Sequence, residues 1–445
     1  MKVAVVGSGI SGLAVAHTLA RRADITLFEA GSWFGGHTHT VDVTLPTARG
    51  LVTQGVDTGF LVLNERTYPQ LIALLQSLDV ATARSDMSFS VQVPDAFAGR
   101  GLEWSGSSLS SVFAQRSNLL RPRFLQMLRE LLRFNALATG LARSGQESDL
   151  EQPLGAFLRE HRFSESFRDW YLLPMLGCIW SCPTQQMLQF PVSTLIRFCH
   201  NHGLLQVADR PLWWTVEGGA RNYVDKIVGK LDDKRLDTPV LRIERSEDGV
   251  RLYTRDGGWE RFDKLVLATH SDQALALLAE PDDAESEVLG AIRYQPNRAV
   301  LHTDTAVLPR RKAAWAAWNF ERSQAAGEET PAVCLHYLLN RLQPLPWTQS
   351  VIVSLNPVRP VDPAKELGEY DYAHPVFDHA AIRAQAKLSL LQGRRHTYFC
   401  GAWTGYGFHE DGLKSGLQVA RQLIVALESE AQDRETSAAA EALPA

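Results

Sequence analysis

The sequence predicts an α/β fold, and two stretches of the chain carry this expectation. Near the N-terminus, the apolar run 2–6 has the pattern of a strand buried in a parallel sheet. A glycine turn, a helical pattern over 13–22 and a second apolar strand over 25–28 follow it. Near the C-terminus, a buried-type strand at 397–401 leads into a glycine-rich loop and the start of a helix. Such alternation is typical of parallel sheets covered by helices.

The composition is that of a large globular protein. The chain has 445 residues, of which 45% are hydrophobic and 21% charged, and its formal net charge is −5. This length corresponds to about two large domains or three smaller ones. The mild acidity argues against a general nucleic-acid-binding protein. The 11 Trp and 18 Phe residues suit a large apolar pocket.

Cysteine usage and hydropathy predict a cytoplasmic protein. The five cysteines are sparse and odd in number, which is not the pattern of a disulfide framework. The N-terminal apolar run carries glycines in place of a cleavage site. All longer apolar runs are interrupted before 18 residues, so we expect no spanning helix. Peripheral contact with the inner membrane face stays open, and the sequence does not indicate an oligomeric state.

The first glycine motif predicts a dinucleotide site. Gly7, Gly9 and Gly12 follow the first strand directly and open the helix. Gly7 permits the tight turn, Gly9 lets the backbone approach a diphosphate, and Gly12 lets the helix pack against the strand. We expect the amides of Ile10 and Ser11, at the positive end of the helix, to hold the phosphates.

An acidic residue at the end of the second strand completes this unit. Glu29 lies 22 residues after Gly7, and we expect it, with the adjacent Ala30, to contact the ribose of an adenosine. The carboxylate would repel a 2′-phosphate, which argues against NADP at this site.

The next segment favours FAD over NAD as the bound cofactor. Residues 29–40 resemble the extended adenosine-and-phosphate motif of flavoproteins with two dinucleotide-binding domains. The resemblance implies non-covalent FAD, with contacts from Gly35, Gly36, His37, Thr38 and Thr40. His37 stands where that family usually has Arg or Lys, so a permanent cation is missing there.

Later motifs resemble flavin-dependent amine oxidases and phytoene desaturases. Asp57, Gly59 and Phe60 match the element that runs past the flavin ring in that superfamily. Residues 401–416 match the last strand, loop and helix start, which implies cofactor contacts from Gly401, Ala402, Gly412 and Leu413, the last two near the flavin C2 carbonyl. Ala402 replaces the usual acid of the family, and we expect Glu410 or Asp411 to supply the missing contact.

The complete pattern, over roughly residues 1–430, resembles a bacterial subgroup of predicted NAD/FAD-binding proteins. Related modules are fused to, or encoded beside, cyclopropane-fatty-acyl-phospholipid synthases. The resemblance implies a Rossmann-like, amine-oxidase-like fold in which an α/β FAD domain alternates with a discontinuous α+β substrate domain. We expect FAD-domain segments at 1–75, 215–290 and 391–430, substrate-domain segments at 76–214 and 291–390, and a disordered tail at 431–445.

The middle of the chain suggests a hydrophobic substrate. Aromatic and apolar residues gather at 170–183, 204–214, 315–320 and 336–337, which suits a pocket for a long apolar chain. The amphipathic, arginine-rich helix expected at 121–142 could rest on anionic lipid head groups, although a solvated face is the simpler interpretation. Cys178 and Cys182, with Cys199 and His200 nearby, do not have zinc-site spacing, so we expect no metal.

Three functions remain open. The first is an FAD-dependent oxidoreductase that desaturates a lipid acyl chain, or isomerises its double bond, by hydride transfer to flavin N5. The second is a flavin amine oxidase. The third is a non-catalytic FAD-carrying partner of a lipid methyltransferase or cyclopropane synthase. For either enzyme, His409, beside the C-terminal glycine loop, is the candidate catalytic residue.

The cofactor assignment predicts a yellow protein. Oxidised FAD held by the chain should give absorption bands at about 370 and about 450 nm, because the isoalloxazine ring carries the colour. The visible spectrum of the purified protein, before and after incubation with FAD and removal of the unbound flavin, tests this. A colourless protein under both conditions would contradict the cofactor assignment.

Overall fold

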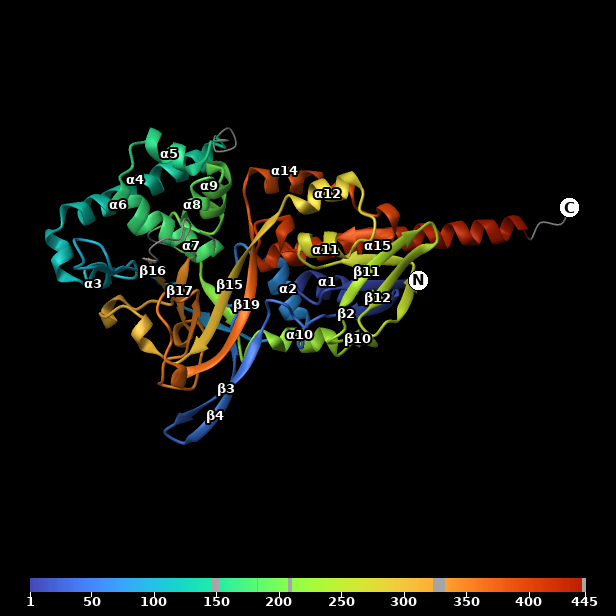
Figure 1. Cartoon of the computed structure of the whole chain (residues 1–445), viewed down its shortest axis with the longest axis horizontal. Helices are drawn as coiled ribbons and strands as arrows, with labels where there is room; N and C mark the ends of the chain where they lie inside the picture. The colour runs from blue at the N-terminus through green and yellow to red at the C-terminus, as the bar shows by residue number, and fades with distance from the viewer. Residues whose placement is uncertain (146–149, 151, 182, 207–209, 323–332, 442–445) are drawn as a thin grey trace.

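A computed structural model describes residues 1–445 except 146–149, 151, 182, 207–209, 323–332 and 442–445. Two sheets organise the chain (Figure 1). The first contains five parallel strands in the order β10 (Asp233–Arg235), β2 (Asp24–Phe28), β1 (Lys2–Val6), β14 (Lys264–Leu267) and β20 (Thr397–Phe399). Three separate parts of the chain therefore build one sheet, as the α/β expectation requires.

Helices cover one face of this sheet, and a second small sheet covers the other. The helical face carries α1 (Ile10–Leu19), α10 (Arg221–Val228), α2 (Pro69–Ser77) and α15 (His409–Glu441), which share one apolar cluster with the central strands. The opposite face carries the antiparallel strands β11 (Val240–Ser246), β12 (Gly249–Thr254) and β13 (Trp259–Phe262), with α11 (Ser271–Leu277), α12 (Asp283–Gly290) and α14 (His379–Lys387).

The first strand–helix turn is possible only with glycine. Gly7 has φ +100°, and a Cβ there would lie 2.8 Å from the Ala268 carbonyl oxygen. A Cβ on Gly12 would lie 1.9 Å from the Gly7 carbonyl oxygen, and one on Gly416 would lie 2.3 Å from the Ser11 carbonyl oxygen. Glycine at these positions lets α1 pack closely against both β1 and α15.

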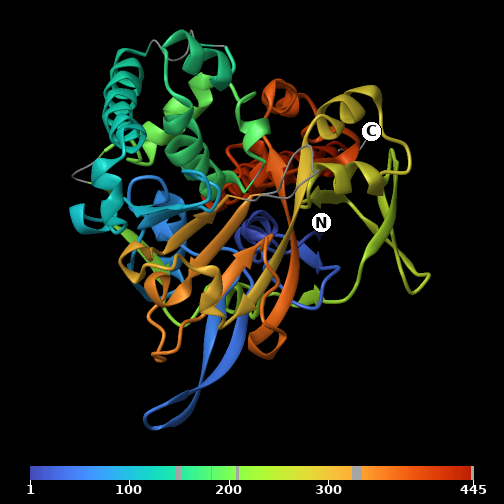
Figure 2. The same ribbon diagram turned by 60° about the vertical axis from the view of Figure 1, so that its left-hand side comes forward.

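A seven-stranded mixed sheet forms the second half of the molecule. Its order is β19 (Glu366–Val376), β15 (Arg293–His302), β18 (Ile352–Leu355), β17 (Cys334–Leu338), β16 (Trp318–Glu321), β7 (Phe89–Val93) and β8 (Leu102–Ser105). The parallel pairing of β16 with β7 joins the two substrate-domain segments of the chain. A helical layer from the first segment lies at one end of the molecule (Figures 1 and 2). It contains α3 (Leu109–Val112), α4 (Pro122–Ser144), α5 (Leu154–Glu160), α6 (Glu165–Phe167), α7 (Leu173–Trp180), α8 (Thr184–Met187) and α9 (Val192–Asn201).

Shorter elements connect the two halves. The hairpin of β3 (Thr40–Thr47) and β4 (Gly50–Asp57) projects from the body of the molecule (Figure 1). A three-stranded sheet contains β5 (Leu63–Asn64), β9 (Trp213–Val216) and β6 (Thr82–Ser85). The short α13 (Leu339–Leu342) follows β17.

Two boundaries differ from the expectation. Residues 379–387 form α14, and Ala381 and Ala384 belong to the apolar cluster on the cofactor-side sheet, so the chain returns to this domain before residue 391. The expected disordered tail is helical up to Glu441, because its Ala, Glu and Gln residues favour helix. Residues 442–445 lie outside the described residues.

The start of α2 is capped by a residue from the other end of the chain. The Glu410 carboxylate accepts hydrogen bonds from the amides of Gln70 (3.0 Å) and Leu71 (2.9 Å). The Asn64 side chain accepts hydrogen bonds from the amides of Arg66 and Thr67 within the preceding turn. Burial raises the pKa of Glu410, and these two amides oppose that shift.

This cap predicts a stability effect that is separate from cofactor binding. Replacing Glu410 by Ala should lower the free energy of unfolding by about 1–2 kcal/mol, because two amides at the start of α2 lose their acceptor. Glu428→Ala, at an exposed position of the same helix α15, is the matched control. Denaturant unfolding measures stability and the flavin spectrum measures cofactor binding. Lost FAD binding with unchanged stability would show that Glu410 is a cofactor contact instead.

Candidate active site

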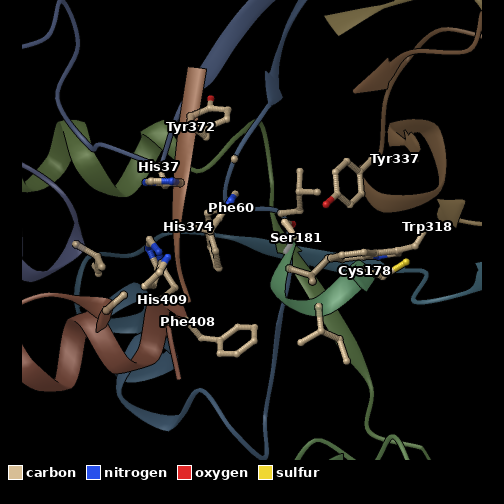
Figure 3. Close-up of a pocket in the computed structure, with 18 of the residues that line it drawn as sticks. His37, Phe60, Cys178, Ser181, Trp318, Tyr337, Tyr372, His374, Phe408 and His409 are labelled. Carbon is tan, nitrogen blue, oxygen red and sulfur yellow. The ribbon is translucent and has the colours of Figure 1, made fainter. Parts of the chain in front are cut away.

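A large cavity runs between the two halves of the molecule (Figure 3). Its volume is about 1600 Å³, which exceeds the volume of ordinary small-molecule pockets. One part is lined by the glycine turn, the loops at 35–37 and 59–62, and residues 268–270 and 401–403. The other part is lined by side chains of α4, α7, α9 and the seven-stranded sheet. The cavity can therefore hold an extended cofactor and a second molecule beside it.

The glycine turn forms the floor of the cofactor part. Gly7, Gly9, Ile10 and Ser11 line the cavity, and α1 begins at Ile10. A Cβ added to Gly9 would meet no protein atom within 4 Å, so it would project into open space at the start of the helix. This arrangement fits a diphosphate, whose oxygens take the amides that the first helical turn leaves unpaired.

Glu29 lies at the end of β2 on the cavity wall, and Ala30 lines the wall beside it. One carboxylate oxygen accepts hydrogen bonds from the Ser8 amide (3.0 Å) and hydroxyl (2.5 Å). The other accepts from the Gly31 amide at 2.8 Å. These contacts hold the carboxylate in one position, where its remaining acceptor capacity can serve the ribose hydroxyls of an adenosine.

Histidines from three elements meet in the cavity. Figure 3 shows His37, His374 and Tyr372 on the cavity wall. The ring centroid of His37 lies 5.4 Å from that of His374, 6.1 Å from that of His270 and 5.1 Å from that of Tyr372. Burial lowers the pKa of His37 and of His270 to about 4 and that of His374 to about 3. All three are therefore neutral near pH 7 in the free protein. The sequence offers no signal for the cluster, since its members come from separate segments.

His37 carries an unpartnered buried atom. Its Nε2 has no hydrogen-bond partner, while the ring hydrogen-bonds the backbone of Ala373. A buried polar atom without a partner costs free energy, so a ligand atom that satisfies it is favoured. Together with the open space at Gly9, this atom indicates that the residues present fit FAD.

Figure 3 shows His409, the sequence-predicted catalytic residue, on the cavity wall. Its ring stacks on Phe60 at a centroid distance of 3.9 Å, and its Nε2 hydrogen-bonds the Tyr223 hydroxyl at 2.8 Å. Burial lowers the pKa of His409 to about 3, so the ring is neutral near pH 7. Its Nε2 is thus engaged with the protein, and a direct catalytic role stays a prediction.

Several other predicted cofactor contacts also line the cavity. They are Gly35, Gly36, Gly59, Gly401 and Ala402. A Cβ on Gly59 would lie 2.2 Å from the His37 carbonyl oxygen, so this glycine lets two cavity loops approach each other.

Some residues that the sequence predicts as cofactor contacts do not line the cavity. Asp57 is 1% exposed, and its carboxylate accepts from the Thr40 hydroxyl (2.5 Å), the Ala220 amide (2.9 Å) and the Gln343 side chain (2.7 Å). Burial raises the pKa of Asp57 to about 6, and these hydrogen bonds oppose the shift. Contrary to the expectation, Asp57 and Thr40 tie β4 to the start of α10 and to the end of α13 and do not line the cavity.

The same correction applies to the C-terminal motif. The Asp411 carboxylate accepts from the Tyr406 and Phe408 amides (3.1 and 3.0 Å) and so shapes the glycine loop, whereas Glu410 caps α2. Gly412 donates its amide to the Phe408 carbonyl, and Leu413 is buried in the core. The residues of this motif that line the cavity are 401–403 and 407–409. Gly12 and Thr38 also lie outside the lining, and the Thr38 hydroxyl bonds the Tyr223 hydroxyl at 2.6 Å.

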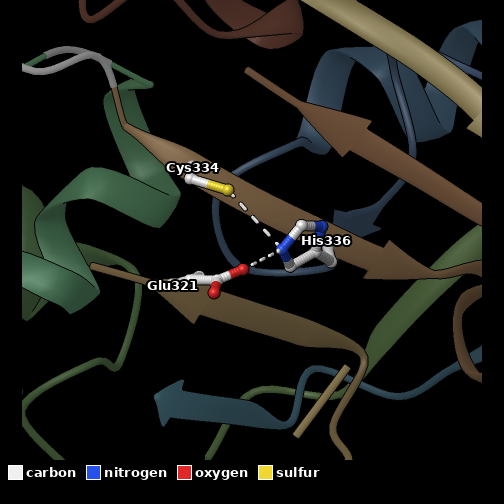
Figure 4. Close-up of side chains that lie close together, drawn as sticks. All are labelled: Glu321, Cys334 and His336. Carbon is white, nitrogen blue, oxygen red and sulfur yellow. Dashed lines mark hydrogen bonds and ion pairs between the residues drawn. The ribbon is translucent and has the colours of Figure 1, made fainter. Parts of the chain in front are cut away.

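One group of potential metal ligands lies outside the cavity. Among the described residues, Glu321, Cys334 and His336 place their ligand atoms within 4.8 Å of one another (Figure 4). Burial lowers the pKa of His336, but Cys334 and Glu321 outweigh burial and raise it to about 9. The Glu321 carboxylate also contacts the Arg359 guanidinium at 3.2 Å. A buried ion pair with a flanking arginine accounts for the group, and the arginine charge opposes a bound cation.

The cysteines also have ordinary packing roles. Cys178 and Cys199 are buried, and burial raises the pKa of both thiols. Cys182 lies outside the described residues. Within the parts of the chain that the structure covers, no helix combines the length and the apolar character needed to cross a membrane.

The His37 environment predicts a pH-dependent affinity for FAD. Because the ring already bonds the Ala373 backbone, a phosphate oxygen at Nε2 requires a protonated ring, and binding takes up a proton. The dissociation constant of FAD should therefore increase, by up to about tenfold per pH unit, as the pH rises above 4. Titrations between about pH 5 and 8 measure it, and His37→Gln should flatten the slope. A flat profile in the unmodified protein would contradict a charged contact.

Comparison with solved structures shows the fold. The CLA-producing fatty acid isomerase from P. acnes superimposes with a TM-score of 0.63 at 17% identity, covering 94% of this chain and 98% of that protein. Cyclohexylamine oxidase from Brevibacterium oxydans superimposes with a TM-score of 0.67 at 17% identity, covering 96% and 99%. The expected amine-oxidase-like architecture is confirmed.

Sequence comparison shows the family. (S)-6-hydroxynicotine oxidase of Paenarthrobacter nicotinovorans is 25% identical over 268 residues, which are 60% of this chain and 59% of that protein. The match therefore spans less than two thirds of the oxidase. The sequence profile described as flavin containing amine oxidoreductase matches residues 10–339, well over half of the chain. FAD is the cofactor that the cavity fits, and the chain belongs to the family of flavin-containing amine oxidoreductases.

Proposed function

We propose that this protein is an FAD-dependent oxidoreductase that acts on the acyl chain of a lipid, by desaturation or by redox-neutral double-bond isomerisation. The observation that carries the proposal is the apolar character of the cavity beyond the histidines. Aliphatic and aromatic side chains from α4, α7, α9 and the seven-stranded sheet line it, among them Leu128, Leu131, Met175, Ile179 and Trp318. Such a lining favours a long neutral chain over a small polar substrate.

The carboxylates of the lining support the same conclusion. Among the described residues, Glu29, Asp86 and Asp371 are the acids that line the cavity. Glu29 serves the cofactor end, and Asp86 accepts hydrogen bonds from the amide and hydroxyl of Ser88 (2.8 Å each). The α4, α7 and α9 walls offer no carboxylate for an ammonium group, which would be costly to bury unpaired.

Different residues of the chain would bind the cofactor and orient the substrate. When bound, FAD would supply a two-electron acceptor, with O2 or another acceptor needed as final oxidant for desaturation and no net oxidant needed for isomerisation. The glycine turn and Glu29 hold the adenosine diphosphate part, and Phe60 packs against His409 beside the ring site. The apolar walls exclude water and align the substrate carbon with the ring.

An amine oxidase is the second candidate. The family is that of flavin-containing amine oxidoreductases, and the relative similar in sequence is (S)-6-hydroxynicotine oxidase. Trp318 and Tyr337 also form an aromatic pair on the cavity wall, with centroids 4.8 Å apart at an interplanar angle of 86°. An aromatic wall can accommodate an amine through its ring faces.

Anaerobic reduction of the bound flavin separates the candidates. Unsaturated phospholipids or fatty acids, dispersed in detergent, and a panel of amines are added separately to the FAD-loaded protein. Bleaching of the long-wavelength band by the acyl substrates supports desaturation, and bleaching by amines overturns the proposal. Where neither bleaches, product analysis of the lipid decides: a shifted double bond supports isomerisation, and unchanged lipid favours a non-catalytic FAD-carrying partner of a lipid-modifying enzyme.

The apolar wall predicts a chain-length effect. Leu128→Trp should narrow the substrate part of the cavity and raise KM for long acyl chains about tenfold or more, because overpacking a wall costs about 1–3 kcal/mol. Ala136→Trp, at an exposed position of the same helix α4 outside the lining, is the control. The flavin spectrum should be unchanged in both variants. Equal KM values for Leu128→Trp and the unmodified protein would place the acyl chain elsewhere.

A further inference from the structure

An arginine-rich, leucine-studded surface lies at the far end of the helical layer. It is formed by α3, the short 3-10 helix η1 (Arg116–Leu120) and α4, far from the C-terminal helix (Figure 1). We call it the α3–α4 face. It consists of the leucines 109, 119, 120, 125 and 132 and the arginines 116, 121, 123, 129, 133 and 143.

The charge of this face is opposite to that of the protein. Residues 109–145 contain six arginines, no lysine or aspartate and one glutamate, which gives a net charge of +5 in a chain of net charge −5. That glutamate, Glu130, is buried and accepts hydrogen bonds from the Ser164 amide (2.9 Å) and hydroxyl (2.6 Å). No exposed acid within this segment therefore balances its six arginines.

Some arginines of the face donate hydrogen bonds, and their acceptors are uncharged groups. Arg123 donates to the Ser166 hydroxyl, and Arg133 donates to the His161 carbonyl and lies over the Phe163 ring. Within the described residues, none of the six forms an ion pair with a carboxylate, whereas arginines elsewhere on the surface do, as in Arg298 with Glu369 and Arg394 with Asp282. The guanidinium charges thus remain available to an external anion.

The leucines of the face are unusually exposed. Leu120 is 87% exposed, Leu109 80% and Leu132 58%, with Leu119 and Leu125 also exposed. Single exposed leucines are common, but five within one short segment indicate an interaction surface. Leu109 and Leu132 also line the large cavity. The cavity therefore reaches the surface beside these leucines, within the positively charged region.

We propose that the α3–α4 face docks on a bilayer containing anionic phospholipids, and that an acyl chain enters the cavity between Leu109 and Leu132. Leucines that enter the acyl boundary and arginines that meet head-group phosphates are the combination that interfacial helices use. A second copy of the chain is a poorer occupant, because a symmetric dimer would bring two faces of the same charge together. The entry route rests on the proposed function, whereas the docking does not.

Vesicle binding by the FAD-loaded full chain tests the proposal. Flotation with phosphatidylcholine vesicles is compared with flotation with vesicles in which part of the lipid is phosphatidylglycerol. We expect binding to increase about tenfold or more with the anionic lipid and to decrease with added salt. Equal binding to both vesicles, or binding to neither, would overturn the proposal.

Variants locate the contact. Arg116→Gln combined with Arg129→Gln, both at exposed positions of the face, should reduce binding to anionic vesicles about tenfold or more. Leu120→Ser should reduce it severalfold by removing apolar insertion. Arg255→Gln and Leu51→Ser, exposed and distant from the face, are the matched controls. The flavin spectrum verifies folding of each variant. Equal losses in the control and face variants would contradict this surface.

Turnover by the unmodified protein separates the docking from the proposed function. Vesicle binding together with turnover of acyl substrates supports both inferences. Turnover of detergent-dispersed substrate without vesicle binding would overturn the docking and leave the function standing. Anionic-lipid binding without turnover of any acyl substrate would overturn the function and leave the docking standing.

Discussion

The close approach of backbones around the first glycine turn is the constraint on which the rest of the structure depends. Gly7, Gly12 and Gly416 bring β1, α1 and α15 together at distances that no Cβ would permit. The start of α1 is thereby aimed into the cavity, with Gly9 open toward it. Because the same turn packs against β14 through Ala268, the segments of the cofactor-side sheet meet at one place. A larger residue at these positions would separate the sheet from the helix that holds the phosphates.

Buried acids then join parts of the chain that are far apart in sequence. Asp57 links β4 to the start of α10 and to Gln343 beside α13, and Glu410 links α15 to the start of α2. Each carboxylate is surrounded by donors, which is the condition under which a buried acid is tolerated. These acids hold the cavity walls together, so their contribution to the site is positional. Residues next to a cofactor motif in sequence can thus hold the cavity walls in place without lining the cavity themselves.

The two parts of the cavity differ in chemistry. Neutral histidines, glycine backbone and one carboxylate line the cofactor part, whereas aliphatic and aromatic side chains line the rest. Beyond the second part, the surface changes to exposed leucines among arginines that form no ion pair with a carboxylate of the described residues. This order of surfaces supports the two proposals made above, docking on an anionic membrane and entry of an acyl chain into the cavity.

The sequence by itself determined the elements whose cause is local. The strand, glycine turn, helix and acidic residue of the first 30 residues are specified by neighbouring residues, as is the amphipathic helix α4, so the α/β class, the family and the flavin were accessible. The tertiary structure decided which predicted residues face the cavity. The Glu410 carboxylate accepts a hydrogen bond at the start of α2, 340 residues away in sequence. His37, His270 and His374 lie close together although they come from three separate segments. Such contacts depend on how distant segments pack, and no short pattern of residues records that packing.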